Sequence, residues 1–177
     1  PMSLAFFRFA LASLFLAPFF FAQTKHIKID KKDLPSLIAI GVFIITLNIT
    51  FFFEGIKRTT AIDASVLTLI IPVLSVLLGW WFLKEKIYLV NLLGVAIGFL
   101  GAIIIIGLPV IFLGESSPQM MLVNILLILA SAVWVVGAVI SRQMLKKYSS
   151  LVITAVAFMI GTVTFIFPSL SEYIKNP

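Results

Sequence analysis

Six long apolar runs, separated by short polar connections, decide what this chain can fold into. They cover residues 2–22, 36–56, 65–83, 87–107, 120–141 and 151–170. An α-helix needs about 20 residues to cross the ~30 Å hydrocarbon core of a bilayer, and each run has roughly this length. The runs do not alternate between apolar and polar residues, as the strands of a transmembrane barrel do. Because a backbone in lipid must satisfy its own hydrogen bonds, the runs predict an all-α integral membrane protein with six transmembrane helices.

The composition excludes the ordinary soluble classes. Of the 177 residues, 62% are hydrophobic and 11% are charged, whereas soluble domains have about 45–50% and ~25%. The chain has no cysteine, which excludes disulfides and thiolate metal sites, and its one histidine, His26, excludes a multi-histidine metal site. The runs hold neither a pair of carboxylates nor a Ser–His–Asp set. We therefore expect no enzyme activity, no cofactor and no metal.

The basic residues predict an orientation in the membrane. The loops at 23–35, 84–86 and 142–150 hold nine Lys and Arg residues, whereas the opposite face holds three. Because basic residues mark the cytoplasmic side, these three loops are predicted to be cytoplasmic, in an inner or plasma membrane. The N-terminus is then outside, although no signal peptide precedes it. Since the chain also begins with Pro1, we expect that a further N-terminal helix is missing.

Small and polar residues inside the runs are the candidates for a solute path. Such residues are costly in lipid and tend to face a protein interior or a cavity. In runs 65–83 and 120–141 they fall on one face of the helix, where helix packing and a solute cavity are equally open explanations. In run 87–107 the spacing of Gly94 and Gly98 favours packing. The cavity candidates are Asn48, Ser65, Thr68, Pro72, Ser75, Ser131 and Trp134.

Three charged residues are further candidates: Arg8, Glu54 and Glu85. Arg8 lies inside the first run, where its long side chain can reach the outer surface or pair with an anionic group. Glu54 is the only carboxylate inside an assigned run, and we favour a local pair with Lys57 or Arg58 over a role in proton coupling. For Glu85 we expect local pairing or capping of the following helix.

A faint internal repeat relates the first and last runs. At an offset of 150 residues, Ala5 aligns with Ala155, Phe15 with Phe165 and Pro18 with Pro168. The two runs are an odd number of spans apart and therefore cross the membrane in opposite senses. A repeat at this spacing would be an inverted-topology repeat, which is the plan of many secondary transporters.

Several segments resemble the EamA-type drug/metabolite transporter superfamily. The stretch 59–75 has a Thr-rich turn, an Ala-Ser entry and a proline, and a glutamate at a helix end and a glycine-patterned helix follow at 83–86 and 93–102. Residues 3–9, with Arg8, are similar to the family's second helix, and 129–134 to the start of its second repeat. The resemblance implies two inverted five-helix repeats, of which this chain would hold helices two to seven. It also makes Arg8, Pro72 and Glu85 positions of the family pattern.

Two functions are open to such a chain. The first is a permease that moves small metabolites, amino acids or drug-like solutes by alternating access. Residues 1–113 would then be the remainder of the first repeat and 114–177 the start of the second. The alternative is a non-transporting assembly or regulatory subunit that uses the same polar faces to bind partner helices. The expected partners are the lipid bilayer and a small-molecule solute, with no nucleic acid, and a homodimer is one option for the assembly.

Overall fold

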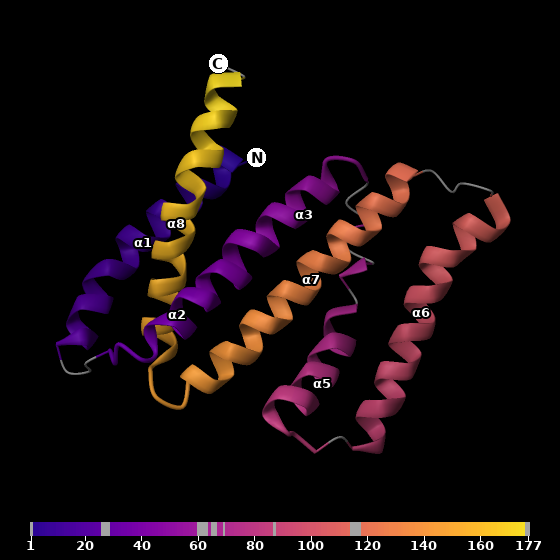
Figure 1. The fold of residues 1–177 in the computed structure, drawn as a ribbon, viewed down its shortest axis with the longest axis horizontal. Coiled ribbons are helices and arrows are strands. Elements are labelled where there is room, and N and C mark those ends of the chain that lie inside the picture. Colours follow the sequence, from indigo (N-terminus) through magenta and orange to yellow (C-terminus); the bar gives the residue numbers. More distant parts are fainter. Residues whose placement is uncertain are drawn as a thin grey trace. The chain divides into compact units, whose positions relative to one another are not determined.

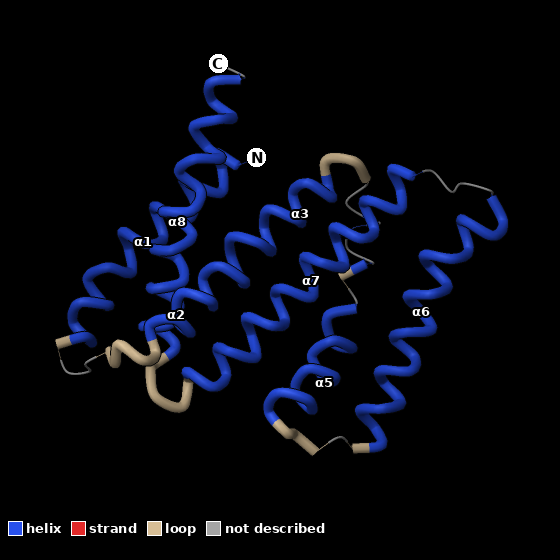
Figure 2. Tube along the Cα trace, viewed as in Figure 1, coloured by secondary structure: helices blue, strands red, loops and turns tan. Residues whose placement is uncertain are grey.

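The structure, a computed structural model, describes residues 2–25, 29–59, 64, 67–68, 70–86, 88–113 and 118–175. Within these residues the regular structure is entirely helical (Figures 1 and 2). The elements are α1 (Met2–Thr24), α2 (Leu34–Gly41), the π-helix η1 (Val42–Leu47), α3 (Asn48–Ile56), α5 (Ile70–Leu83), α6 (Leu89–Leu113), α7 (Pro118–Met144) and α8 (Ser150–Lys175). The prediction of an all-helical protein is confirmed for the described part of the chain.

Four of the helical segments are long and apolar enough to cross a membrane. They are Met2–Gln23, Leu34–Ile56, Met121–Met144 and Ser150–Ile174. Two more apolar helices, Ile70–Leu83 and Leu89–Gly101, are shorter over the residues that the structure describes. A 14-residue helix such as α5 rises about 21 Å, which is less than the ~30 Å bilayer core. The chain is therefore a multi-pass membrane protein: four segments have the length and hydropathy of a span, and α6 is 25 residues long as a whole.

The third predicted run differs most from the structure. It was expected to be one helix over 65–83, but Thr68 lies in a turn and α5 begins at Ile70. Pro72 is therefore the third residue of α5, in its first turn. Backbone N–H groups in a first turn have no partner inside the helix, so a proline there costs no intrahelical hydrogen bond. Pro72 therefore frees no carbonyl in mid-span, and the Thr68 carbonyl four residues before it accepts the backbone N–H of Ile71.

The chain divides into two compact units. Unit 1 comprises Pro1–Leu47 and Val136–Pro177, and unit 2 comprises Asn48–Val135. The first boundary separates η1 from α3, and the second falls inside α7. These units are defined by contacts within the chain, so they do not test the predicted repeat boundary between residues 113 and 114. That boundary stays a prediction.

In unit 1, α1 and α8 pack side by side and run in opposite directions (Figure 1). Ser3 of α1 contacts Glu172 and Ser13 contacts Thr162. A step of ten residues along α1 is thus matched by ten residues in the reverse direction along α8. Between these pairs, the buried Phe9 ring stacks on the buried Phe165 ring, with 6.0 Å between the ring centroids.

The α2–η1 segment packs closely against α8 and α7 in unit 1. A Cβ atom added at Gly41 would lie 2.8 Å from Cβ of Ile160, and one at Gly161 would lie 2.6 Å from Ile45. On the α7 side, a Cβ at Gly137 would lie 2.5 Å from Ile44. These approaches are too short for any side chain. The three glycines therefore let the helix backbones meet, as small residues do in membrane proteins.

Unit 2 has its own apolar cluster. Ala64, Leu67, Val123 and Leu127 are buried, and Phe52 and Ile56 pack against them. Gly55 of α3 lies directly under the Leu127 side chain, 2.9 Å from the position that a Cβ would take. At the α5–α6 contact, a Cβ at Gly98 would lie 3.2 Å from Val73, whereas Gly94 and Gly101 have no described atom within 4 Å. The predicted packing role in α6 is therefore seen at Gly98 and not at Gly94.

Candidate functional site

Two pairs of hydroxyl groups connect helices inside the membrane region of unit 1. The Ser13 and Thr162 hydroxyl oxygens lie 3.1 Å apart, and those of Thr46 and Thr164 lie 2.8 Å apart. Thr162 already donates its single hydroxyl proton to the Phe158 carbonyl, and Thr164 donates to the Gly161 carbonyl. A hydroxyl has one proton to donate. Ser13 and Thr46 are therefore the donors in the two interhelical bonds.

Two of the predicted cavity residues come together in unit 2. The side-chain amide of Asn48, in α3, donates a hydrogen bond of 2.9 Å to the Ala130 carbonyl of α7. The adjacent residue, Ser131, is 1% exposed and donates to the Leu127 carbonyl, one turn earlier in its own helix, at 3.0 Å. Both polar groups are satisfied by backbone carbonyls. Asn48 thus makes an interhelical hydrogen bond between α3 and α7 in this structure.

The remaining cavity candidates occupy several environments. Ser65 lies outside the described residues. Thr68 and Ser75 are half-buried, Pro72 is exposed in the first turn of α5, and Trp134 is 36% exposed. Asn48 and Ser131 are grouped at the α3–α7 contact. A shared cavity with Thr68, Ser75 and Trp134 stays a prediction.

The three charged candidates make local contacts. The Arg8 guanidinium carbon lies 5.7 Å from the centroid of the neighbouring Phe9 ring, within the range of a cation–π interaction. Lys57 Nζ lies 2.6 Å from Glu54 Oε1, so the local i,i+3 pair favoured for Glu54 is formed. The Glu85 side chain folds back over α5, with Oε2 lying 2.9 Å from the Cβ position of Gly79.

The structure shows a second carboxylate in a span, which the sequence boundaries missed. Helix α8 continues to Lys175, beyond the predicted limit at residue 170, so Glu172 lies inside the span Ser150–Ile174. Its Oε2 accepts hydrogen bonds from the backbone N–H of Ser3, at 2.8 Å, and from the Ser3 hydroxyl, at 2.9 Å. Beside this contact, α1 and α8 line an open, mostly apolar pocket of about 430 Å³, with Phe6, Phe7, Ser169 and Tyr173 among its lining residues.

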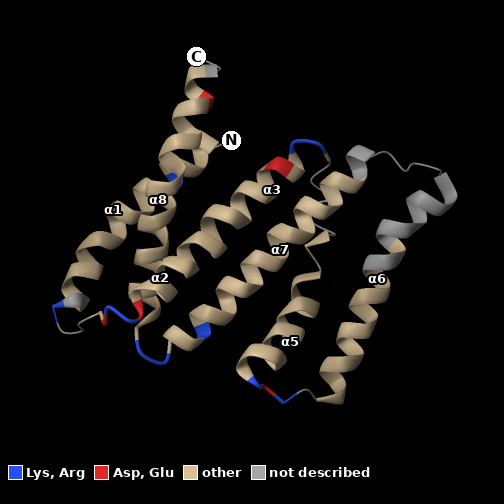
Figure 3. Ribbon diagram, viewed as in Figure 1, with Lys and Arg blue, Asp and Glu red and all other residues tan. Residues whose placement is uncertain are grey.

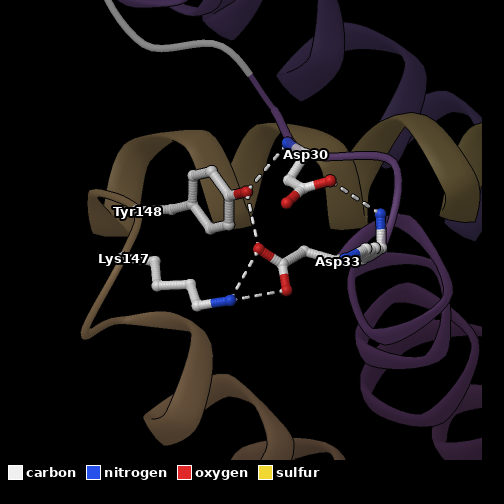
Figure 4. A network of polar contacts seen from close by, with 5 residues as sticks. Asp30, Asp33, Lys147 and Tyr148 are labelled. Atoms are coloured by element: carbon white, nitrogen blue, oxygen red, sulfur yellow. Dashed lines mark hydrogen bonds and ion pairs between the residues drawn. The ribbon is translucent and has the colours of Figure 1, made fainter.

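A polar cluster at the other end of unit 1 was also missed (Figure 4). Asp33 Oδ1 and Oδ2 accept bonds of 2.8 and 3.0 Å from Lys147 Nζ, and Oδ2 accepts a 2.8 Å bond from the Tyr148 hydroxyl. The Tyr148 oxygen in turn accepts the backbone N–H of Asp30 at 3.1 Å. Nearby, the Ser149 hydroxyl contacts the Gln23 side-chain oxygen.

Charge and hydrogen bonding in this cluster favour the ionised forms. The Lys147 ammonium group, and then the Tyr148 hydroxyl, lower the pKa of Asp33 below its ordinary value of 3.8. The hydrogen bond to Asp33 raises the pKa of Lys147 above 10.5. Both groups are therefore charged across the physiological range.

The cluster also brings two of the predicted cytoplasmic loops to the same end of unit 1. Asp33 contacts Lys147 and Tyr148, Gln23 contacts Ser149, and described basic residues of both loops lie at this end (Figure 3). Alternation of the spans predicts that these loops share one side of the membrane. In the structure, the described parts of these two loops lie at the same end of unit 1.

Comparison with known proteins identifies the family. Residues 1–107 match the EamA-like transporter family. The chain belongs to this family. EamA transporters are generally not enzymes, and the chain shares their multi-pass, membrane-embedded character.

Curated relatives of this EamA chain are named as transporters. An uncharacterized transporter of Archaeoglobus fulgidus is 31% identical over 177 residues, which are all of this chain and 60% of the relative. A second one from the same organism is 26% identical over 99% of this chain and 59% of the relative. The uncharacterized transporter YxxF of Bacillus subtilis is 34% identical over 59% of this chain and 34% of the relative. The chain thus spans at most about 60% of these relatives, and no solved structure matches it at a significant level.

Proposed function

We propose that the full-length protein moves a small metabolite, amino acid or drug-like solute across the inner or plasma membrane by alternating access. Membership of the EamA-like transporter family carries this proposal. The named relatives are transporters, and the apolar helices suit a bilayer. On this proposal, residues 1–113 belong to the first repeat and 114–177 to the second.

The packing of α1 against α8 supports an inverted repeat. In an inverted repeat, equivalent helices run in opposite directions and are related by a two-fold axis in the membrane plane. The sequence offset of 150 residues makes Val163 the counterpart of Ser13. The contact between Ser13 and Thr162 lies one residue from that position. An inverted repeat with this offset would have its two-fold axis near the middle of both helices, and the antiparallel register of α1 and α8 supports this position.

The solute path is proposed to use the polar faces of α3, α5 and α7. Asn48 and Ser131 form its most clearly grouped pair, and both are bonded to backbone carbonyls in this structure. Ser75 is the better position for a test, because it is half-buried, whereas a change at the fully buried Ser131 would disturb helix packing.

A flux assay on the full-length protein tests the function. The protein is reconstituted in liposomes and screened for uptake of labelled amino acids, metabolites and cationic dyes. We expect uptake that Ser75→Phe reduces at least tenfold and that Leu77→Phe, at a side chain 43% exposed, leaves within twofold. Absence of uptake for all solute classes would instead favour an assembly or regulatory subunit. Equal loss in both variants would place Ser75 in helix packing.

A further inference from the structure

Asp33, the residue directly before α2, makes side-chain hydrogen bonds that are unusual for its position. Asp33 is the N-cap of α2, and an N-cap aspartate ordinarily accepts a hydrogen bond from the first turn of its own helix. Here the Asp33 side chain makes no capping bond. Both carboxylate oxygens instead bind the α7–α8 connection, through Lys147 Nζ and the Tyr148 hydroxyl. The carboxylate is thus used to hold α2 to another part of the chain.

The partners around Asp33 differ in their exposure to water. The Asp33 and Lys147 side chains are 10% and 57% exposed, and Tyr148 is 5% exposed. The neighbouring Asp30 carboxylate accepts the backbone N–H of Lys32 and attracts Lys147 through space, less strongly than Asp33 does. Partly buried ion pairs add little net stability compared with apolar packing. The charged groups of an ion pair, however, are well solvated by water once they separate, whereas separated apolar groups are not. An ion pair therefore suits a contact that breaks and reforms at a water-exposed surface.

Helix α2 is placed to act as a short lever. Its eight residues lie between Asp33 and the π-helix η1. Its far end meets α8 at a close contact between Gly41 and Ile160. Sharp bends and hinges in helices occur at π-helical segments. A small rotation at Gly41 would move Asp33, about 12 Å away along the helix.

We propose that Asp33, Lys147 and Tyr148 form a latch that holds the start of α2 against the α7–α8 connection while this end of the transporter is closed. The latch breaks when the end opens. This inference rests on the proposed alternating-access function and names a conformational control for it. On the proposed repeat division, the latch joins the first repeat to the second.

The test measures the opening directly in the full-length protein. Spin labels on cysteines at Lys31 and Lys146, both exposed and on opposite sides of the latch, report their separation by double electron–electron resonance in liposomes. We expect Asp33→Asn and Tyr148→Phe each to enlarge a second population that is longer by on the order of 5 Å, a shift of about one helical turn. The matched control, Asp30→Asn, removes the same charge three residues away and should leave the distances unchanged.

Two further measurements separate the possible failures. Exchanging the charges, with Asp33→Lys and Lys147→Asp together, should restore the short distance. If Asp33→Asn lowers the unfolding temperature but leaves the distance distribution as in wild type, the cluster is a static contact and the latch is refuted. A changed distance distribution in a protein that transports no tested solute would refute the proposed function and leave the movement at Asp33 established.

Discussion

The Thr46 hydroxyl donates a hydrogen bond to the Thr164 hydroxyl, whose oxygen lies 2.8 Å away on α8. Thr46 belongs to the π-helix η1, and the residue before it, Ile45, fills the space over Gly161. The polar contact and the glycine contact therefore hold the same segment against α8. This arrangement fixes the irregular part of the Leu34–Ile56 span while its N-terminal part, α2, is held mainly through Gly41 and Asp33.

Removing the Thr46–Thr164 bond should have a small effect on stability. In Thr46→Val, Thr164 still donates to Gly161, so no buried proton loses its partner. Interhelical hydrogen bonds in membrane proteins average about 0.6 kcal/mol in double-mutant cycles. We expect a coupling energy near that value between Thr46→Val and Thr164→Val, measured from unfolding in mixed micelles. A coupling of zero would mean that the two hydroxyls do not bond in the membrane.

The contact at Gly41 should not tolerate even a methyl group. The added Cβ of Gly41→Ala would lie 2.8 Å from Ile160 Cβ, an atom next to the α8 backbone that cannot easily move. Overpacking of this kind costs about 1–3 kcal/mol. Gly94→Ala is the matched control, since no described atom lies within 4 Å of its Cβ position, and alanine favours a helix by up to ~1 kcal/mol. Equal unfolding free energies for both variants would contradict the close α2–α8 approach.

The helices were largely predictable because hydropathy and run length are local properties. The exceptions have local causes as well. Pro72 stands close to the true start of α5, and a proline early in an apolar run indicates a helix beginning. Glu172 was excluded because the predicted run ends at residue 170, before Ser171, yet the helix continues past the point where its side chains turn polar.

The contacts between helices were not predictable from one sequence. Asp33 and Lys147 are 114 positions apart, and their sequence shows only that two charged loops share a side of the membrane. The partner of Thr46 depends equally on how α8 is rotated against η1. Glycines gave a mixed signal: the spacing of Gly94 and Gly98 predicted packing that Gly98 makes, while Gly41 and Gly137 pack closely without such a motif.

The Asp33–Lys147 pair should be insensitive to pH near neutrality. The folded pKa of Asp33 is lowered, so its stabilisation is present above the unfolded value and is lost as the pH falls through the folded pKa. The folded pKa of Lys147 is raised, so its stabilisation is present below the unfolded value and is lost as the pH rises through the folded pKa. The difference in unfolding free energy between wild type and Asp33→Asn should be constant between about pH 5 and 9. A difference near zero at every pH would show that the pair is not formed, and a transition near pH 6 or 7 would contradict the lowered pKa of Asp33.

Glu54→Gln should be nearly silent. The Glu54 and Lys57 side chains are 37% and 42% exposed, and exposed helical pairs contribute about 0.3–0.5 kcal/mol. Gradient-driven uptake by the full-length variant should therefore stay within twofold of wild type. Loss of uptake with solute exchange preserved would instead make Glu54 a proton-coupling residue.

The ends of α8 should lie on opposite sides of the membrane. Lys146 is exposed just before α8, beside the basic loop, and Tyr173 is 72% exposed near its far end. Because basic loops stay in the cytoplasm, a single cysteine at Lys146 in a cysteine-free full-length protein should be shielded from an impermeant thiol reagent in intact cells. A cysteine at Tyr173 should be labelled, and permeabilising the cells should expose both. Labelling of the Lys146 position in intact cells would reverse the orientation of every span, and with it the assignment of the Asp33 cluster to the cytoplasmic end.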